Sequence, residues 1–369
     1  MIKTKLSKKI SLTFKYPKTA LNTINDLLNP QKTVSFPHLI NCFITEKCNF
    51  NCPMCHVAKS RLKNSSQLSF IDIKKIADQG SKHGISIQLS GGEPLLHPEI
   101  IKIIKYLHQK KIVTGLVTNG LLLEKYAQDI IKSGLDFIAI SLDGPDEATQ
   151  YQRGFVKNSF SKINKGIQTL VKLRGSKSFP NIRLATVINK NNLHNFEKIY
   201  SLAQKLKVDQ WSLSHYFYYF DQIKKSQNKF FKKYHTGNDV WGQYIGSNKQ
   251  FLNTNEISIL ENKLKKLRNK KNHKLIVSLP PKINLQKYYQ GDYPSQASIC
   301  TSPFKQIFIR GNGDVEMCHG FIIGNIKKQN LQKIWQNSKA QNFRKIFKRL
   351  KQIPACFRCC ALDIKFDND

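Results

Sequence analysis

The sequence has few acidic residues and no long hydrophobic run. Its 24 Asp and Glu residues oppose 60 Lys and Arg residues, which gives a formal net charge of +36. No run of eighteen apolar residues occurs, and no continuous apolar stretch follows the basic N-terminal residues as in an export signal. These absences exclude a membrane-spanning helix and favour a cytoplasmic protein. The 40% hydrophobic content allows one large core, which argues against a disordered chain.

The positive charge is compatible with an anionic substrate, a nucleic acid or an acidic membrane surface. Lysines are spread along the chain and accompany many Asn and Ile residues, so biased composition is the simpler explanation, and nucleic acid is not favoured as a partner. Within residues 1–18, Ile2, Leu6 and Ile10 recur every four residues among lysines. That pattern is typical of a basic helix that associates weakly with an acidic membrane surface, although a solvated helix has the same pattern.

Short β-branched runs alternate with stretches of helical period between residues 38 and 220. We expect strands at 39–45, 85–89, 112–117, 137–142, 182–188 and 210–215. We expect helices at 69–83, 98–109, 122–133, 159–173 and 193–206. Such alternation implies an α/β fold with a parallel sheet, and six units predict an open partial (β/α)6 barrel whose functional site lies at the carboxyl ends of the strands.

The rest of the chain divides into three further segments. Residues 1–37 form a basic N-terminal segment, and residues 221–297 read as an insertion or linker with one helix at 256–267. Residues 298–369 read as a small domain with a hairpin, at 306–310 and 314–318 around a Gly-Asn-Gly turn, followed by two basic helices and a cysteine-rich tail.

Eight of the nine cysteines fall into two clusters with the spacing of metal ligands. Cys48, Cys52 and Cys55 form a Cys-x3-Cys-x2-Cys loop after the first strand. A cubane iron–sulfur cluster needs four ligands, so three thiolates from one loop leave the fourth iron open. A zinc site would need a fourth side chain, and His56 is poorly placed because it directly follows Cys55. The ninth, Cys42, lies within the first strand and is expected to be a core thiol.

Polar motifs follow the next three strands. They are Ser90-Gly91-Gly92-Glu93-Pro94, Thr118-Asn119-Gly120 and Ser141-Leu142-Asp143-Gly144. Each alone would read as a turn, because Asn-Gly and Asp-Gly are turn dipeptides. Their order at successive strand ends, together with the cysteine loop, resembles the radical S-adenosylmethionine (SAM) superfamily.

The resemblance implies a [4Fe–4S] cluster on the three cysteines, with SAM bound to the open iron. Reductive cleavage of SAM would give a 5′-deoxyadenosyl radical that abstracts a substrate hydrogen, with a reductase such as flavodoxin or ferredoxin as electron donor. In this family Gly91, Gly92 and Glu93 would meet the SAM ammonium. The residues expected around the rest of SAM are Asn119, Ser141, Asp143 and Arg153, the last of which would pair with the SAM carboxylate or be a surface arginine. Two departures, Met54 before Cys55 and the absence of a glycine motif at 184–188, weaken only the adenine contacts.

The second cluster comprises Cys300, Cys318, Cys356 and Cys359, with Cys360 adjacent. It resembles the C-terminal SPASM extension, and more closely its shortened twitch form, which implies an auxiliary [4Fe–4S] cluster. A four-cysteine zinc knuckle is the alternative. The spacing favours Cys359 over Cys360 as the fourth ligand without settling the choice.

The resemblance implies oxidation or rearrangement of a small molecule, sugar-like or lipid-linked. Maturation of a peptide or protein side chain by a SPASM-type enzyme is one alternative. Another is a non-enzymatic metal-cluster protein that binds nucleic acid, which would show salt-dependent binding and no SAM turnover. His215, at the end of the sixth strand with Tyr216 and Tyr218, is a candidate base for an alcohol oxidation, although a packed histidine is the simpler interpretation.

Overall fold

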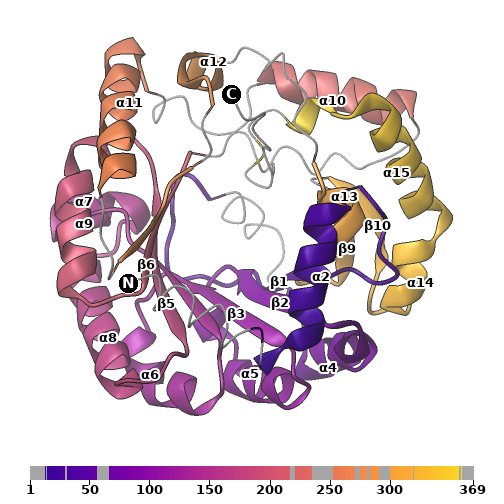
Figure 1. The fold of residues 1–369 in the computed structure, drawn as a ribbon, viewed down its shortest axis with the longest axis horizontal. Helices are drawn as coiled ribbons and strands as arrows, with labels where there is room; N and C mark the ends of the chain where they lie inside the picture. The colour runs from indigo at the N-terminus through magenta and orange to yellow at the C-terminus, as the bar shows by residue number, and fades with distance from the viewer. Residues whose placement is uncertain are drawn as a thin grey trace.

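A ten-stranded sheet, curved inside a ring of helices, forms the framework of the protein (Figure 1). The computed structural model describes residues 13, 15–29, 31–55, 66–216, 221–234, 252–270, 275–280, 283–290, 300–318, 320–356 and 359. The strand order is β10-β9-β8-β1-β2-β3-β4-β5-β6-β7. None of the helices in these ranges is both long and apolar enough to cross a membrane.

The central six strands are parallel and follow the sequence order. They are β1 (Leu39–Thr45), β2 (Ser86–Gly91), β3 (Val113–Thr118), β4 (Phe137–Ser141), β5 (Asn181–Val187) and β6 (Gln210–Ser214). The helices outside them are α4 (Phe70–Gly80), α5 (Ile100–Gln109), α6 (Leu123–Lys132), α7 (Glu147–Gly154), α8 (Ser159–Arg174) and α9 (Phe196–Lys205). The predicted α/β class and open partial barrel are confirmed. The sequence did not predict α7, which is short and polar.

The two faces of the sheet differ in chemistry because strand side chains alternate. In β1, Ile40, Cys42 and Ile44 are fully buried, and the equivalent residues of the other strands continue this apolar layer toward the helices. Burial raises the pKa of the Cys42 thiol to about 12, as expected for a core cysteine. The opposite face of the strands is turned toward the interior of the barrel and carries more polar residues.

Segments outside the central units extend the sheet at both edges. At one edge β7 (Ile276–Ser278) pairs in parallel with β6, so part of the presumed insertion belongs to the sheet. The same segment contributes α10 (Asp221–Lys233), α11 (Thr254–Asn269) and α12 (Leu285–Gln290). At the other edge β8 (Gln306–Ile309) pairs in parallel with β1.

The C-terminal hairpin is therefore continuous with the barrel sheet. The antiparallel strands β9 (Asp314–Cys318) and β10 (Phe321–Asn325) complete this edge, followed by α14 (Leu331–Gln336) and α15 (Ser338–Leu350). The short α13 (Ser302–Lys305) directly precedes β8. The hairpin was predicted, whereas β10 and the pairing with β1 were not.

The helix α2 (Pro17–Leu28) lies at the amino ends of the barrel strands and turns its polar side toward the protein. Asn22 donates hydrogen bonds to the carbonyls of His83 and Gly84 at 2.7 and 3.1 Å, and Asp26 pairs with His38 and Lys305, each at 2.8 Å. The apolar side chains of α2 point away from the body and are 55–75% exposed: Leu21, Ile24, Leu27 and Leu28. The predicted basic helix covers residues 1–18, of which 1–12 and 14 lie outside the described residues.

Candidate active site

The cysteine loop after β1 is held by the backbone at the end of β2. The Gly92 N–H donates to Thr45 O and the Glu93 N–H to Lys47 O, both at 2.7 Å. Gly91 has a φ of +129°, and a Cβ on Gly92 would lie 2.1 Å from Lys47 O. The glycines were predicted to allow a close approach to a ligand. In this structure, the glycines allow the end of β2 to lie close to the backbone of the cysteine loop.

The helix α7 supports the other side of the same loop. The Phe50 ring lies against Gly154, where a Cβ would be 2.3 Å from the ring, and the Asn51 N–H donates to Gly154 O at 3.3 Å. The Phe50 N–H in turn points to Cys48 Sγ at 3.4 Å. The backbone that carries Cys48 and Cys52 is thus fixed from two directions.

Glu93 joins β2 to the end of β3. Its fully buried carboxylate accepts hydrogen bonds from Thr118 Oγ1 at 2.7 Å, the Asn119 N–H at 2.7 Å and the Leu95 N–H at 3.0 Å. Burial raises the pKa of Glu93, and these three donors oppose the rise. The carboxylate is enclosed by protein donors, so its predicted contact with an ammonium group stays a prediction.

Asn119 extends this connection to the cysteine loop. Its Nδ2 donates to Asn49 Oδ1 at 2.7 Å and lies 3.9 Å from Cys48 Sγ, while its Oδ1 accepts from the Leu121 N–H. Asn119 was predicted to contact SAM. Its contacts in the structure place it beside the first of the three thiols.

The thiols of the loop share one electrostatic environment. Burial raises the pKa of Cys52 to about 12; the Arg153 guanidinium opposes the rise, and Cys55 and Cys48 add to it. Within the described ranges, no three His, Cys, Asp or Glu side chains are arranged as a group that could hold a metal ion. Three soft thiols on one braced loop, beside a cation that favours thiolate, nevertheless fit the donor set of an iron–sulfur cluster.

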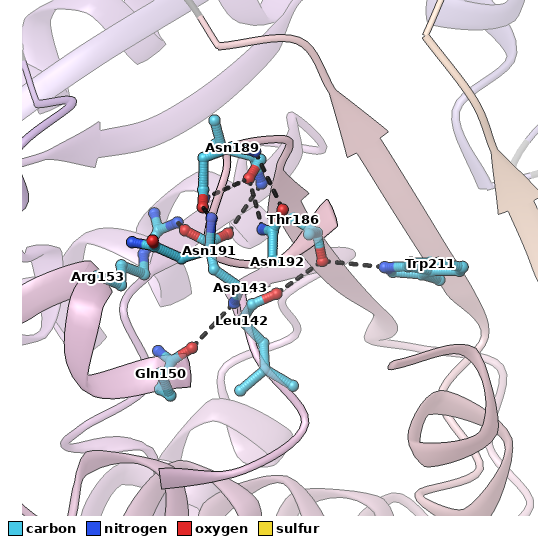
Figure 2. A network of polar contacts seen from close by, with 10 residues as sticks. Leu142, Asp143, Gln150, Arg153, Thr186, Asn189, Asn191, Asn192 and Trp211 are labelled. Carbon is cyan, nitrogen blue, oxygen red and sulfur yellow. Dashed lines mark hydrogen bonds and ion pairs between the residues drawn. The ribbon is translucent and has the colours of Figure 1, made fainter. Parts of the chain in front are cut away.

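Asp143 and Arg153 form an ion pair beside that loop (Figure 2). Arg153 Nη1 lies 2.5 Å from Asp143 Oδ2, while the Val187 N–H donates to Asp143 Oδ1 at 2.8 Å. Burial works against the charge of Arg153, but Asp143, Cys52 and Cys55 raise its pKa. Arg153 Nε is buried and has no hydrogen-bond partner among the described residues. The two residues predicted to contact SAM are therefore adjacent, and their contact with SAM stays a prediction.

A pocket opens next to this pair. It is lined by Pro53, Met54, Asp143, Thr149, Gln152, Arg153, Asn189, Asn191 and Asn192. The three asparagines form a turn after β5, in which the Asn189 N–H donates to Asn192 Oδ1 and the Asn191 N–H to Asn189 Oδ1 (Figure 2). Sequence reasoning did not include these asparagines, although their position after a strand was the available signal. Ser141 ends β4 and is nearly buried.

His215 follows β6 and packs among tyrosines. Its Nδ1 lies 3.2 Å from the Tyr289 hydroxyl, and its ring centroid lies 5.0 Å from that of Tyr288. The Tyr288 hydroxyl donates to Tyr216 O at 3.1 Å. This setting agrees with a packed histidine, so the catalytic role of His215 stays a prediction. Tyr218 lies outside the described residues.

Two cysteines of the second cluster come together in the C-terminal region. Burial raises the pKa of Cys356 to about 12, and Cys300 contributes to the rise. Cys356 Sγ accepts from the Ile353 N–H at 3.4 Å, and the Cys359 N–H donates to Cys356 O at 3.2 Å. Cys318 ends β9. Cys360 is not among the described residues, so the choice between Cys359 and Cys360 is not tested.

Two family models match the chain. Residues 42–203 match the radical SAM superfamily, and residues 300–360 match an iron–sulfur cluster-binding domain, SPASM. A probable GTP 3′,8-cyclase of Methanococcus maripaludis is 36% identical over 132 residues, which are 35% of this chain and 44% of the relative. An AdoMet-dependent heme synthase of Methanosarcina barkeri is 30% identical over 172 residues, which are 46% of this chain and 48% of the relative. The aligned regions thus span about half the length of these relatives.

The fold has solved counterparts. The crystal structure of Streptococcus suis SuiB bound to S-adenosylmethionine superposes with a TM-score of 0.65 over 90% of this chain and 74% of that chain, at 16% identity. At this level of identity the likeness concerns the fold.

Proposed function

The chain belongs to the radical SAM superfamily and carries a C-terminal SPASM domain, and we propose that it is an enzyme that cleaves SAM reductively and abstracts a hydrogen atom from a small molecule. The observation that carries the proposal is the braced loop of Cys48, Cys52 and Cys55 beside the pocket of Asp143 and Arg153. A reductase of the flavodoxin or ferredoxin type is the proposed electron donor.

The residues of the pocket suit the two charged ends of SAM. Cys48, Cys52 and Cys55 would hold the [4Fe–4S] cluster, which when bound supplies the electron that breaks a sulfonium bond of SAM. Arg153 is held by Asp143 beside the pocket and is the proposed partner of the SAM carboxylate, since guanidinium groups bind carboxylates well. Gly91 and Gly92 let the backbone at the end of β2 approach the cysteine loop closely. Glu93 binds Asn119, which donates a hydrogen bond to Asn49 of the loop.

The C-terminal cysteines are proposed to hold an auxiliary cluster. Cys300 and Cys356 are buried and close enough to affect each other's charge, and Cys318 and Cys359 extend the set. With all four ligands from protein, such a cluster would exchange electrons and leave substrate binding to the barrel. This arrangement favours an oxidation of the substrate.

A small-molecule substrate, sugar-like or lipid-linked, is proposed ahead of a peptide. The two curated relatives carry the names of a GTP cyclase and a heme synthase, both of which refer to small molecules. The structural neighbour SuiB has been solved with its precursor peptide, and peptide maturation is the second candidate. Incubating the enzyme with small molecules and with peptides, followed by product analysis, distinguishes the two candidate functions.

Iron content tests the two clusters. After anaerobic reconstitution, the full chain should hold about eight irons, and replacing Cys48, Cys52 and Cys55 together with alanine should leave about four. Cys42→Ala is the matched control, because that thiol is buried in the core and should leave both clusters intact. About four irons falling to none would contradict the auxiliary cluster. Formation of 5′-deoxyadenosine from SAM and dithionite tests the reaction itself.

We also propose that α2 associates weakly with an acidic membrane surface. An amphipathic helix that exposes its apolar side is unusual, because four large side chains remain in water. Lys18 in α2 and Lys32 after it are exposed, and the chain carries a net charge of +36 overall, which is complementary to anionic lipid.

Vesicle flotation tests the association. The full chain should float with vesicles containing phosphatidylglycerol and not with pure phosphatidylcholine. Replacing Leu21 and Leu28 with serine should abolish flotation. Ile71→Ser removes an equally exposed apolar side chain from α4 and should not. Equal flotation of all three proteins would contradict the role of α2.

A further inference from the structure

Arg183 lies on the interior face of the barrel sheet. In β5 it stands between Ile182 and Leu184, which are fully buried on the helix-facing side. Because successive strand residues point to opposite faces, Arg183 points toward the barrel interior. Its neighbours in register are Ala139 of β4 and Gln210 of β6.

None of the described strand residues that flank Arg183 on this face is acidic. The side chains on the same face of β4, β5 and β6 are Phe137, Ala139, Ser141, Asn181, Ala185, Val187, Gln210, Ser212 and Ser214. On the next strand, Gly115 pairs with Phe137 and adds no side chain to this face. Gln210 directs its amide to Ser212 at 3.2 Å.

Arg183 differs in this respect from the other arginines of the described part of the chain that are not exposed. Arg153 pairs with Asp143, Arg174 with Asp209 and Arg310 with Glu316. Arg344 donates to two carbonyls and stacks on Trp335. Arg183 has no hydrogen bond or ion pair with a described residue.

A partly buried cation without a partner is costly to the fold. Burial lowers the pKa of Arg183, and no neighbouring acid offsets this effect. A guanidinium presents five donors in a planar fork that matches phosphate and carboxylate oxygens. An anion from outside the chain would satisfy these donors.

We propose that Arg183 binds an anionic group, phosphate or carboxylate, of the substrate inside the barrel. The proposal rests on the proposed function, because it assigns a substrate class to the same barrel. Arg183 lies four residues before Val187, whose N–H binds Asp143, which is about 13 Å along the strand. The substrate is therefore an extended anion, of the size of a sugar phosphate or a nucleotide, with its anionic end deep in the barrel and its reacting carbon near the pocket at the strand ends.

Anion binding by the reconstituted full chain tests this assignment. The probes are inorganic phosphate, pyrophosphate and citrate, titrated by calorimetry at constant ionic strength. Arg183→Gln removes the planar guanidinium group and keeps much of the side-chain volume, whereas Arg183→Lys keeps the positive charge. Arg268→Gln removes one charge from the exposed surface of α11 and is the matched control.

We expect at least one probe to bind the wild-type chain and Arg268→Gln equally. Its affinity should fall about 10- to 100-fold in Arg183→Gln, the range for hydrogen bonds to a charged group, and less in Arg183→Lys. Preference for pyrophosphate or for citrate identifies the anionic group. The same affinity in wild type and Arg183→Gln, or saturable binding of none of the probes, overturns the proposal.

The same preparation separates this proposal from the proposed function. Formation of 5′-deoxyadenosine from SAM and dithionite is measured without any of the three anion probes. A chain that cleaves SAM and binds no probe contradicts only the role of Arg183. A chain that binds pyrophosphate through Arg183 and never cleaves SAM contradicts the proposed function and leaves an anion site.

Discussion

Replacing Gly92 with alanine is expected to detach the cysteine loop from the end of β2. The new Cβ would lie 2.1 Å from Lys47 O and 2.6 Å from Lys47 C, below the contact distance of any real Cβ. Relief of this overlap requires the two backbones to separate by about 1 Å. The two 2.7 Å hydrogen bonds that join them would then exceed hydrogen-bond length. At about 0.5–1.5 kcal/mol each, their loss lowers the free energy of unfolding by about 1–3 kcal/mol.

Of the two proposed clusters, only the one on the cysteine loop should be affected. The Gly92→Ala chain should lose about four irons, those of the first cluster, and keep the C-terminal four. Urea unfolding measures the stability, and iron analysis measures the cluster. Gly115→Ala is the matched control, because its Cβ meets nothing closer than 3.9 Å and its φ is not positive. A Gly92→Ala chain with wild-type iron content and stability would refute the reasoning.

Two further predictions concern stability. Burial lowers the pKa of His97, so folding favours the neutral ring. The free energy of unfolding should therefore fall as the pH drops below about 6.5, the ordinary pKa of histidine. His97→Gln should flatten that pH dependence, whereas His194→Gln, at an exposed site, should not. A steeper fall in His97→Gln would contradict this sign. Tyr16 donates to both oxygens of the buried Asp136 at 2.9 Å, so Tyr16→Phe should lower the free energy of unfolding in urea by about 1.5–3 kcal/mol. Tyr106→Phe removes a solvent-exposed hydrogen bond to Asp78 and should cost less; equal costs would show that the buried bond contributes little.

The parallel core of the barrel could be predicted from the sequence because local pattern determines it. Strand β1 was predicted with the observed bounds, and β2 to β6 within one or two residues, since β-branched runs bounded by turn residues leave few alternatives. The helix α7 was missed because its sequence has almost no apolar period; it buries Gln150 and Gly154. The strand β7 has three residues, too few for any pattern.

The site was less predictable because its contacts are not local. The motifs placed Gly91, Gly92 and Glu93 near a ligand, but no spacing rule shows that Gly92 lies against Lys47 or that Thr118 and Asn119 enclose Glu93. The pairing of Asp143 with Arg153 depends on the helix that was missed. Similarly, only the register of β5 shows that Arg183 stands between Ala139 and Gln210, with no acidic residue opposite it.

The pairing of β1 with β8 has a consequence for how the chain folds. Residues 39–42 of β1 are synthesised long before their partners at 306–309. Until then one edge of β1 remains without a neighbour and can pair with another chain. Closing so long a loop is slow, and slow β pairing exposes a nascent chain to aggregation. We therefore expect a fragment that ends before β8 to be recovered mainly in inclusion bodies, even though it contains the whole cysteine loop.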